Sequence, residues 1–196
     1  MKVDLKDVAD VQIGYQPRCQ LANHLKGSHL VIQMRDFDAE GCFHADTLAR
    51  VTPETDTSRY AVRDGDVVFQ ARGTRNRAFV LRGVPAATLA SNHFYIVRMR
   101  PNVALPQFLA WSVNLPSAQE HLMERAQGTT MMLVPKDAFE SLEIDVPPLA
   151  VQRRISDLTC LADCERQLMT AIQGKREKLI SAVCLRALKS EGGREG

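Results

Sequence analysis

The stretch that decides the fold is PPLAVQRRISDLTCLADCERQLMTAIQGKREKLISAVCLRAL, residues 147–188. The stretch begins with two prolines, which end the preceding strand. From Val151 to Leu188 it contains no proline and a single glycine, Gly174. Such a run predicts one helix of about 38 residues, roughly 57 Å long at about 1.5 Å per residue. That length exceeds what one small domain needs as a cover, so we expect part of the helix to pack against another helix.

Apolar residues recur along this predicted helix in a seven-residue frame. One seam takes Ile155, Ala162, Met169, Arg176 and Val183, and the other takes Leu158, Glu165, Ile172, Leu179 and Arg186. We expect the apolar members to form a dimer or partner interface: Ile155, Leu158, Ala162, Met169, Ile172, Leu179 and Val183. The charged members make the seam too imperfect for a long parallel zipper. The alternative is a helix that folds back on its own domain, with a break at Gly174.

Residues 1–104 predict short strands separated by turns, and helices follow them. Strands are expected at Leu30–Met34, Val67–Phe69, Ala78–Leu81, Phe94–Val97 and Leu142–Val146. Pro106 opens a helix that Pro116 breaks, and a second short helix runs through Leu122. The expectation is an α/β (α+β) domain over residues 1–148 with a twisted, mostly antiparallel sheet. A long helix over 149–189 and a flexible polar tail over 190–196 complete the chain.

Composition matches an ordinary globular protein, with 45% hydrophobic and 24% charged residues. The formal net charge of +2 is too small to mark a polyanion-binding protein, but residues 70–100 hold six arginines and no carboxylate. No stretch approaches the roughly 20 apolar residues of a membrane span, and the first residues lack the apolar run of a signal peptide. Five cysteines without a C-x-x-C pair indicate reduced thiols, so we expect a cytoplasmic protein.

The sharpest local signal is DGDVVFQARGTRNR, residues 64–77, in which a turn leads into an apolar strand. The strand then presents a polar set that suits DNA: Gln70, Arg72, Gly73, Thr74, Arg75, Asn76 and Arg77. Arginine matches guanine or phosphate, glutamine and asparagine pair with adenine, and glycine lets the backbone approach closely. We expect DNA contact here, with the strand-borne residues reading bases. The alternative is a solvated hairpin whose arginines pair with acidic residues elsewhere.

Further residues could extend this surface, although nothing in the sequence shows that they converge. Candidates upstream are Gln16, Arg18, Lys26 and Arg35. Gly128, Thr129 and Thr130, followed by Lys136, could hold a backbone phosphate, or could form a helix C-cap followed by a strand. Asn92 and His93, in the run Ala90-Ser91-Asn92-His93, are either polar contacts or turn residues.

Motifs of catalysis and cofactor binding are missing from the sequence. There is no P-loop, no G-x-S-x-G and no Rossmann glycine pattern. The five histidines lack metal-ligand spacing. Cys160 and Cys164 stand four apart, which predicts two small buried or seam residues rather than a metal site. The run Val146-Pro147-Pro148-Leu149 is similar to the N-P-P-[YF] loop of amino-methyltransferases. It has valine in place of the asparagine and no aromatic residue, so it could not hold the target amine. We therefore expect no enzyme, no metal and no cofactor in this chain.

Taken in order, several of these runs resemble the specificity subunit of type I restriction-modification systems. The runs are DGDVVF-x-x-RG from Asp64, ASNH from Ala90, GTT from Gly128 and PPL-x-x-Q-x-x-I from Pro147. The last is the most distinctive, and the order holds over nearly the whole chain.

The resemblance implies a target-recognition domain over residues 1–148, followed by a helix that acts as spacer and docking rod. It also implies that separate modification subunits methylate adenine N6 with S-adenosylmethionine, and that motor-nuclease subunits cleave DNA in the full assembly. The usual subunit carries two recognition domains and two helices, whereas this chain of 196 residues holds one of each and is similar to a half-subunit.

From this resemblance we expect a sequence-specific double-stranded DNA-binding subunit that is not itself an enzyme. Two copies paired through antiparallel helices would read an interrupted palindrome. The leading alternative is a non-catalytic interaction module that uses the helix alone and binds no specific DNA; a stand-alone enzyme is the third.

Overall fold

The computed structural model describes residues 1–16, 27–38, 41–73, 76–129 and 131–191, with side chains up to Leu188. They form two compact units, Met1–Ser156 and the residues from Asp157 onward. The strands are β1 Lys2–Asp4, β2 Ala9–Ile13, β3 His29–Ile32, β4 Ala49–Val51, β5 Val67–Gln70, β6 Ala78–Val80, β7 Thr88–Ala90, β8 Phe94–Met99 and β9 Glu143–Asp145. The α-helices are α1 Leu5–Val8, α2 Pro106–Val113, α3 Pro116–Arg125, α4 Lys136–Glu140 and α5 Leu149–Glu191. Single 3-10 turns lie at Met34–Asp36, Ala45–Thr47 and Ser58–Tyr60.

A four-stranded antiparallel sheet, in the order β2-β8-β5-β6, forms the centre of the first unit. Side chains alternate between its faces, as the period of a strand requires. Phe69 and Val97 point into a core with α1–α4, whereas Val68 and Ile96 point into a second core on the other face. Because β5 has neighbours on both sides and cores on both faces, its sequence reads as a continuous apolar run.

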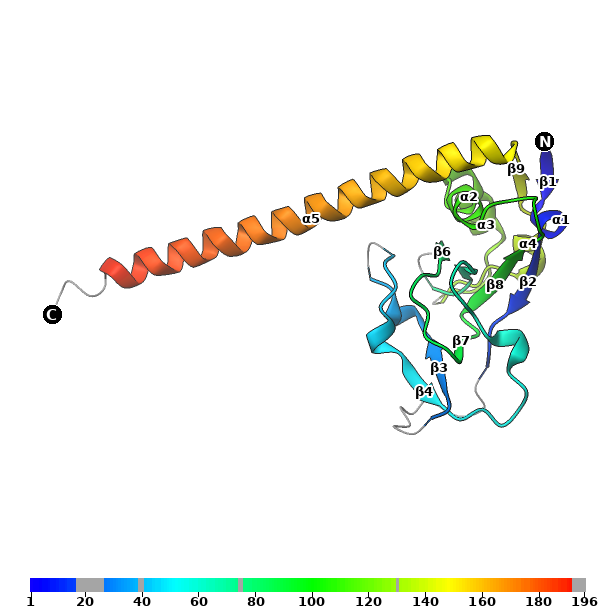
Figure 1. The fold of residues 1–196 in the computed structure, drawn as a ribbon, viewed down its shortest axis with the longest axis horizontal. Coiled ribbons are helices and arrows are strands. Elements are labelled where there is room, and N and C mark those ends of the chain that lie inside the picture. The colour runs from blue at the N-terminus through cyan, green and yellow to red at the C-terminus, as the bar shows by residue number, and fades with distance from the viewer. Residues whose placement is uncertain (17–26, 39–40, 74–75, 130, 192–196) are drawn as a thin grey trace. The chain divides into compact units, whose positions relative to one another are not determined.

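Two smaller sheets complete the unit. Strands β4, β3 and β7 form one, in which β3 pairs antiparallel with β4 and parallel with β7. Strands β1 and β9 pair antiparallel and bring the first residues of the chain beside the strand that precedes α5 (Figure 1). The expected fold class is confirmed, although the strands divide among three sheets.

The predicted helices of the first unit are confirmed at their starts, since Pro106 and Pro116 occupy the first turns of α2 and α3. The sequence analysis missed α1 and α4, which have four and five residues. Each is too short to show a helical period, and each is held by two buried side chains.

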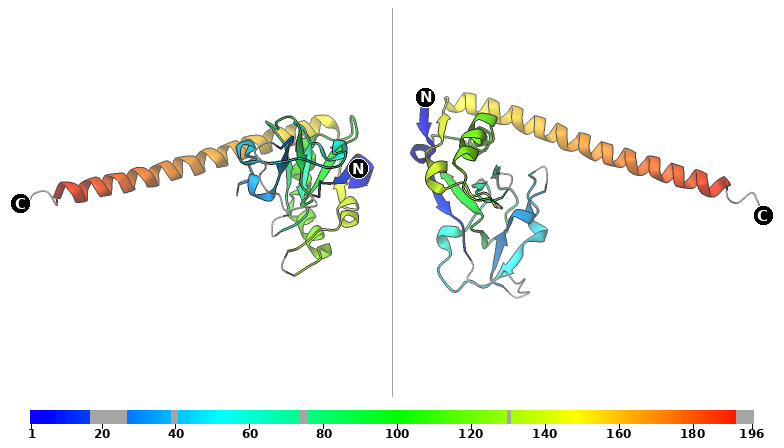
Figure 2. Two further views of the ribbon diagram at one scale, coloured as in Figure 1. Left: turned by 90° about the horizontal axis from the view of Figure 1, so that it is seen from below. Right: turned by 180° about the vertical axis from the view of Figure 1, so that it is seen from behind.

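Helix α5 runs without interruption through Gly174, so the break considered there is not present (Figure 2). Its first two turns belong to the first unit, where Gln152 is fully buried. The Gln152 side chain accepts from Leu105 N–H at 2.9 Å and donates to the carbonyls of Pro147 at 2.8 Å and Val103 at 3.1 Å. These bonds explain why the P-P-L-x-x-Q run needs a glutamine. No helix in the described part of the chain is long and apolar enough to cross a membrane.

Candidate nucleic-acid interface

The turn after β5 is joined by backbone hydrogen bonds to two distant segments. Ala71 N–H donates to the carbonyl of His93 at 2.8 Å, which fixes the turn between β7 and β8 beside it. Val134 N–H donates to the carbonyl of Ala71 at 2.9 Å, and Gly73 N–H donates to the carbonyl of Met132 at 3.0 Å. Three runs that lie far apart in the sequence therefore meet where β5 ends.

The side chain of Gln70 packs closely against Gly73 in this turn. Gln70 Nε2 donates to the carbonyl of Arg72 at 3.0 Å and lies 3.3 Å from Met34 Sδ. Gly73 has a φ of +112°, and a Cβ there would stand 2.9 Å from Gln70 Nε2. A side chain at position 73 would be strained by its backbone angle and would also displace Gln70. The amide of Gln70 closes the turn.

Asn76 is buried, although the sequence analysis expects it to contact DNA. Its Nδ2 donates to the carbonyl of Gln70 at 3.0 Å, while its Oδ1 has no partner among the described residues. The side chain therefore shapes the turn from within. Its contact with DNA remains a prediction.

Arg72 and His93 interact where these three runs meet, and only the arginine is charged. Arg72 is half-buried, and its Nε has no acceptor in the described part of the chain. Burial, and then the charge of Arg72, lower the pKa of His93 below its usual 6.5, so this imidazole stays neutral at pH 7. An unpartnered guanidinium beside a neutral ring is suited to an anionic ligand.

The arginine-rich window divides into paired and unpaired members. Arg98 lies 3.8 Å from Asp66, and Arg100 lies 3.8 Å from Asp10. In contrast, Arg72, Arg77 and Arg82 form no ion pair with any described residue. The alternative of a charge-paired hairpin therefore applies to the C-terminal end of the window and not to Arg72, Arg77 or Arg82.

The other predicted contacts have different surroundings. Arg35, in the 3-10 turn next to Met34, is exposed, as are Arg77 and Thr129. Asn92 is half-buried, and its N–H donates to the carbonyl of Tyr15 at 2.8 Å. Lys136 is engaged by Glu140 at 3.3 Å. Five candidates lie outside the described residues: Arg18, Lys26, Thr74, Arg75 and Thr130.

Sequence reasoning missed the residues that hold the convergence together. Met34 contacts Gln70, and Tyr95 donates its hydroxyl to the carbonyl of Val134 at 2.7 Å. Burial raises the pKa of Tyr95 to about 12. The sequence around Met34 does not indicate a polar contact, and the sequence around Tyr95 predicts only an ordinary strand residue. Only the fold reveals either role.

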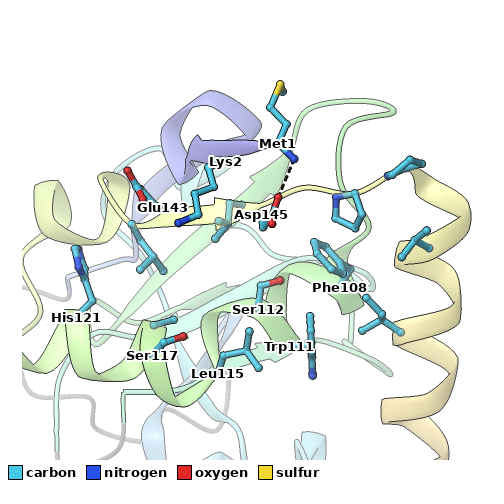
Figure 3. A pocket seen from close by; sticks show the side chains of 17 residues that line it. Met1, Lys2, Phe108, Trp111, Ser112, Leu115, Ser117, His121, Glu143 and Asp145 are labelled. Carbon is cyan, nitrogen blue, oxygen red and sulfur yellow. Dashed lines mark hydrogen bonds and ion pairs between the residues drawn. The ribbon is translucent and has the colours of Figure 1, made fainter.

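A separate cavity of about 780 Å³ lies among β1, β9, α2, α3 and the first turns of α5. Figure 3 shows Phe108, Trp111 and Ser112 on one side of it and the Met1 amino group bound to Asp145, at 2.8 Å, on another. That bond lowers the pKa of Asp145. The lining is mainly apolar, which suits packing more than chemistry.

One half of the cysteine prediction, burial, is wrong, whereas a place in a helix seam stays a prediction. Cys160 and Cys164 are exposed on α5 and are not buried. A helix segment outside the first unit has no core to enter, so small side chains there remain in solvent. The described residues contain no group of three histidine, cysteine or carboxylate side chains that could hold a metal ion.

No family model matches the chain, and no curated protein does. Eleven chains of solved structures do, among them three from type I restriction-modification systems. They are the S subunit of a type I restriction-modification system from M. genitalium, a structure from work on complex assembly and conformational transition of the type I R-M system, and the HsdS subunit from Thermoanaerobacter tengcongensis. Their TM-scores are 0.58, 0.66 and 0.55, and their identities are 14%, 18% and 20%.

The matches cover 83%, 93% and 85% of this chain but only 38%, 43% and 37% of the other three. The chain thus spans about two fifths of the length of the proteins it matches. It has the fold of type I specificity subunits, as the resemblance implies, with one compact unit and one long helix.

Proposed function

We propose that this chain is a non-catalytic specificity subunit that reads double-stranded DNA for a type I restriction-modification complex. One observation carries the proposal: three distant runs are hydrogen-bonded together at the turn after β5, where Arg72 and Arg77 lack ion-pair partners among the described residues. Unpaired guanidinium groups on a turn fixed in this way can approach bases and phosphates without first breaking internal contacts.

Residues at this surface would have different tasks. Arg72, in the turn after β5, would read a base edge, whereas the exposed Arg77, Arg35 and Thr129 would contact phosphates. Gln70 and Asn76 would hold the turn in shape, since their amides already bond to its backbone. Arg18, Lys26, Thr74, Arg75 and Thr130 remain candidates on their sequence positions alone.

In this proposal the partner subunits, and not this chain, carry out catalysis. Modification subunits would bind S-adenosylmethionine and methylate adenine, and motor-nuclease subunits would join them on DNA in the cytoplasm. Two copies of this chain would pair through antiparallel α5 helices. A two-fold pair of identical reading domains would then recognise an interrupted palindrome.

The test measures binding of the full chain to fluorescent duplex DNA at several salt concentrations. We expect affinity to fall steeply with salt, because each phosphate contact releases counterions. The triple variant Arg72→Ala, Arg75→Ala, Arg77→Ala should bind at least about tenfold more weakly, with a shallower salt slope. Arg82→Ala, in the same window but beyond β6, is the matched control and should bind as the parent does.

The alternative interaction module rests on a different observation, the exposed apolar side chains of α5. It makes an opposite prediction about salt. Equal DNA binding by the parent and the triple variant, or binding without salt dependence, would contradict the DNA-reading function and favour that module.

A further inference from the structure

The part of α5 beyond the first unit presents an unpartnered apolar stripe. Leu158, Met169, Ile172, Leu179 and Val183 are each 55% to 68% exposed. They occupy the two seams of the seven-residue frame, and a stripe of this kind is stable in water only when another helix covers it. The frame is interrupted within the stripe by two charged residues of opposite sign, Glu165 and Arg176.

Glu165 and Arg176 differ from the adjacent charged residues Arg166 and Glu177. Arg166 is bound by Asp163 at 2.9 Å, and Glu177 accepts from Gln173 at 3.3 Å, so each is engaged along its own helix. Glu165 and Arg176 are exposed and have no ion pair with any residue that the structure describes. Their charges are available to a partner helix.

In an antiparallel helix pair, residues of one seam face residues of the other seam on the second copy. When Glu165 of one copy faces Arg176 of the other, the two-fold axis passes between Thr170 and Ala171. The symmetry forms this pair twice. Every other layer from 158 to 183 is then apolar: Leu158 faces Val183, Ala162 faces Leu179, and Met169 faces Ile172.

Other registers and orientations place Glu165 and Arg176 opposite apolar residues or opposite a like charge. A shift by one heptad puts Glu165 opposite Met169 or Val183, and Arg176 opposite Leu158 or Ile172. A parallel pair puts Glu165 opposite its own copy and Arg176 opposite its own copy. An unpaired or like-charged group in the seam is strongly unfavourable, whereas a matched pair selects a register at a modest loss of stability.

We propose that α5 pairs with a second copy of itself in the one antiparallel register where Glu165 faces Arg176. The proposal rests on the proposed function, which includes the dimer, and adds its register and the residues that select it. Because the reading domains stand at opposite ends of such a pair, the register would also set the spacing of the two DNA half-sites.

The test measures the mass of full-length chains by light scattering, without DNA. Glu165→Arg alone and Arg176→Glu alone should each raise the dimer dissociation constant roughly a hundredfold or more, since both pairs become like-charged. The double reversal should restore the dimer. Mixing the two single variants should also give a dimer, because all pairs are again opposite in charge.

Matched controls carry the same charge changes on the outer face of the helix: Glu177→Arg and Lys178→Glu, which should remain dimeric. A monomeric parent, dimeric single variants, or a double reversal that stays monomeric would each overturn the register. DNA binding is measured separately, so a wrong register with salt-dependent DNA binding leaves the proposed function standing.

Discussion

The first unit and the distal part of α5 organise their functional residues in opposite ways. In the first unit, the turn at 71–73 is held by bonds to residues 93, 132 and 134. In α5, the ion pair Asp163–Arg166 and the bond Gln173–Glu177 join residues three and four apart. A reading surface assembled from distant runs depends on the whole fold. A helix face depends on its period, and needs a partner to become a binding site.

The largest contrast should come from two glycine substitutions. A Cβ at Gly14 would lie 2.1 Å from the carbonyl oxygen of Ser91, in the run that the interface needs. We expect Gly14→Ala to lower the free energy of unfolding by more than about 3 kcal/mol. At Gly174 nothing lies within 4 Å of the added atom. There the same change should stabilise the helix by about 0.5–1 kcal/mol.

Urea unfolding followed by circular dichroism and tryptophan fluorescence checks both values. Trp111, the single tryptophan, reports on the first unit alone. A Gly14→Ala protein as stable as the parent would contradict the close approach of Gly14 and Ser91.

A second contrast uses glutamines. Gln152→Leu would leave the Leu105 N–H and the carbonyls of Val103 and Pro147 without their partner, in a fully buried place. The expected loss is about 2–3 kcal/mol in the same unfolding measurement. Gln173→Leu, on the exposed helix, should change stability by under about 0.5 kcal/mol. Similar losses for both would mean that Gln152 does not anchor α5.

These contrasts also separate what the sequence predicts from what it does not. The long helix, α2, α3 and the strands at 67–70 and 94–99 follow from local period and from proline positions. The burial of Asn76 and Gln152 does not, because a polar residue in a turn or a first helical turn reads as solvent-exposed. Their partners lie in segments whose proximity no local pattern encodes. For the same reason the convergence of residues 72, 93 and 132 could not be foreseen.

A smaller effect is expected from Tyr95, whose hydroxyl donates to Val134. Its pKa of about 12 in the folded chain exceeds the usual 10.0, so the unfolded chain loses this proton first. The stabilisation is present below pH 10 and is lost as pH rises toward 12. Tyr95→Phe should cost about 1 kcal/mol at pH 8 and should be less sensitive to alkali than the parent. Urea unfolding at pH 8 and pH 11 measures this difference; equal alkaline sensitivity would contradict the buried phenol.

The smallest expected effect is on DNA affinity, and it compares Arg35 with Lys136, which forms an ion pair with Glu140. Arg35→Ala should weaken DNA binding about two- to fivefold and reduce the salt slope by about one contact. Lys136→Ala should change affinity by less than about twofold, because Glu140 already neutralises Lys136. Fluorescence anisotropy across a salt series measures both. A larger loss of DNA affinity for Lys136→Ala than for Arg35→Ala would indicate that the DNA interface lies nearer to α4.

The most direct measurement is selection of duplexes from a randomised pool by the purified full-length chain, followed by sequencing. If two copies read DNA through the turns after β5, the selected sites contain two identical half-sites in inverted orientation at one fixed spacing. A pool that stays random after repeated rounds, or a single uninterrupted motif without symmetry, would contradict the account.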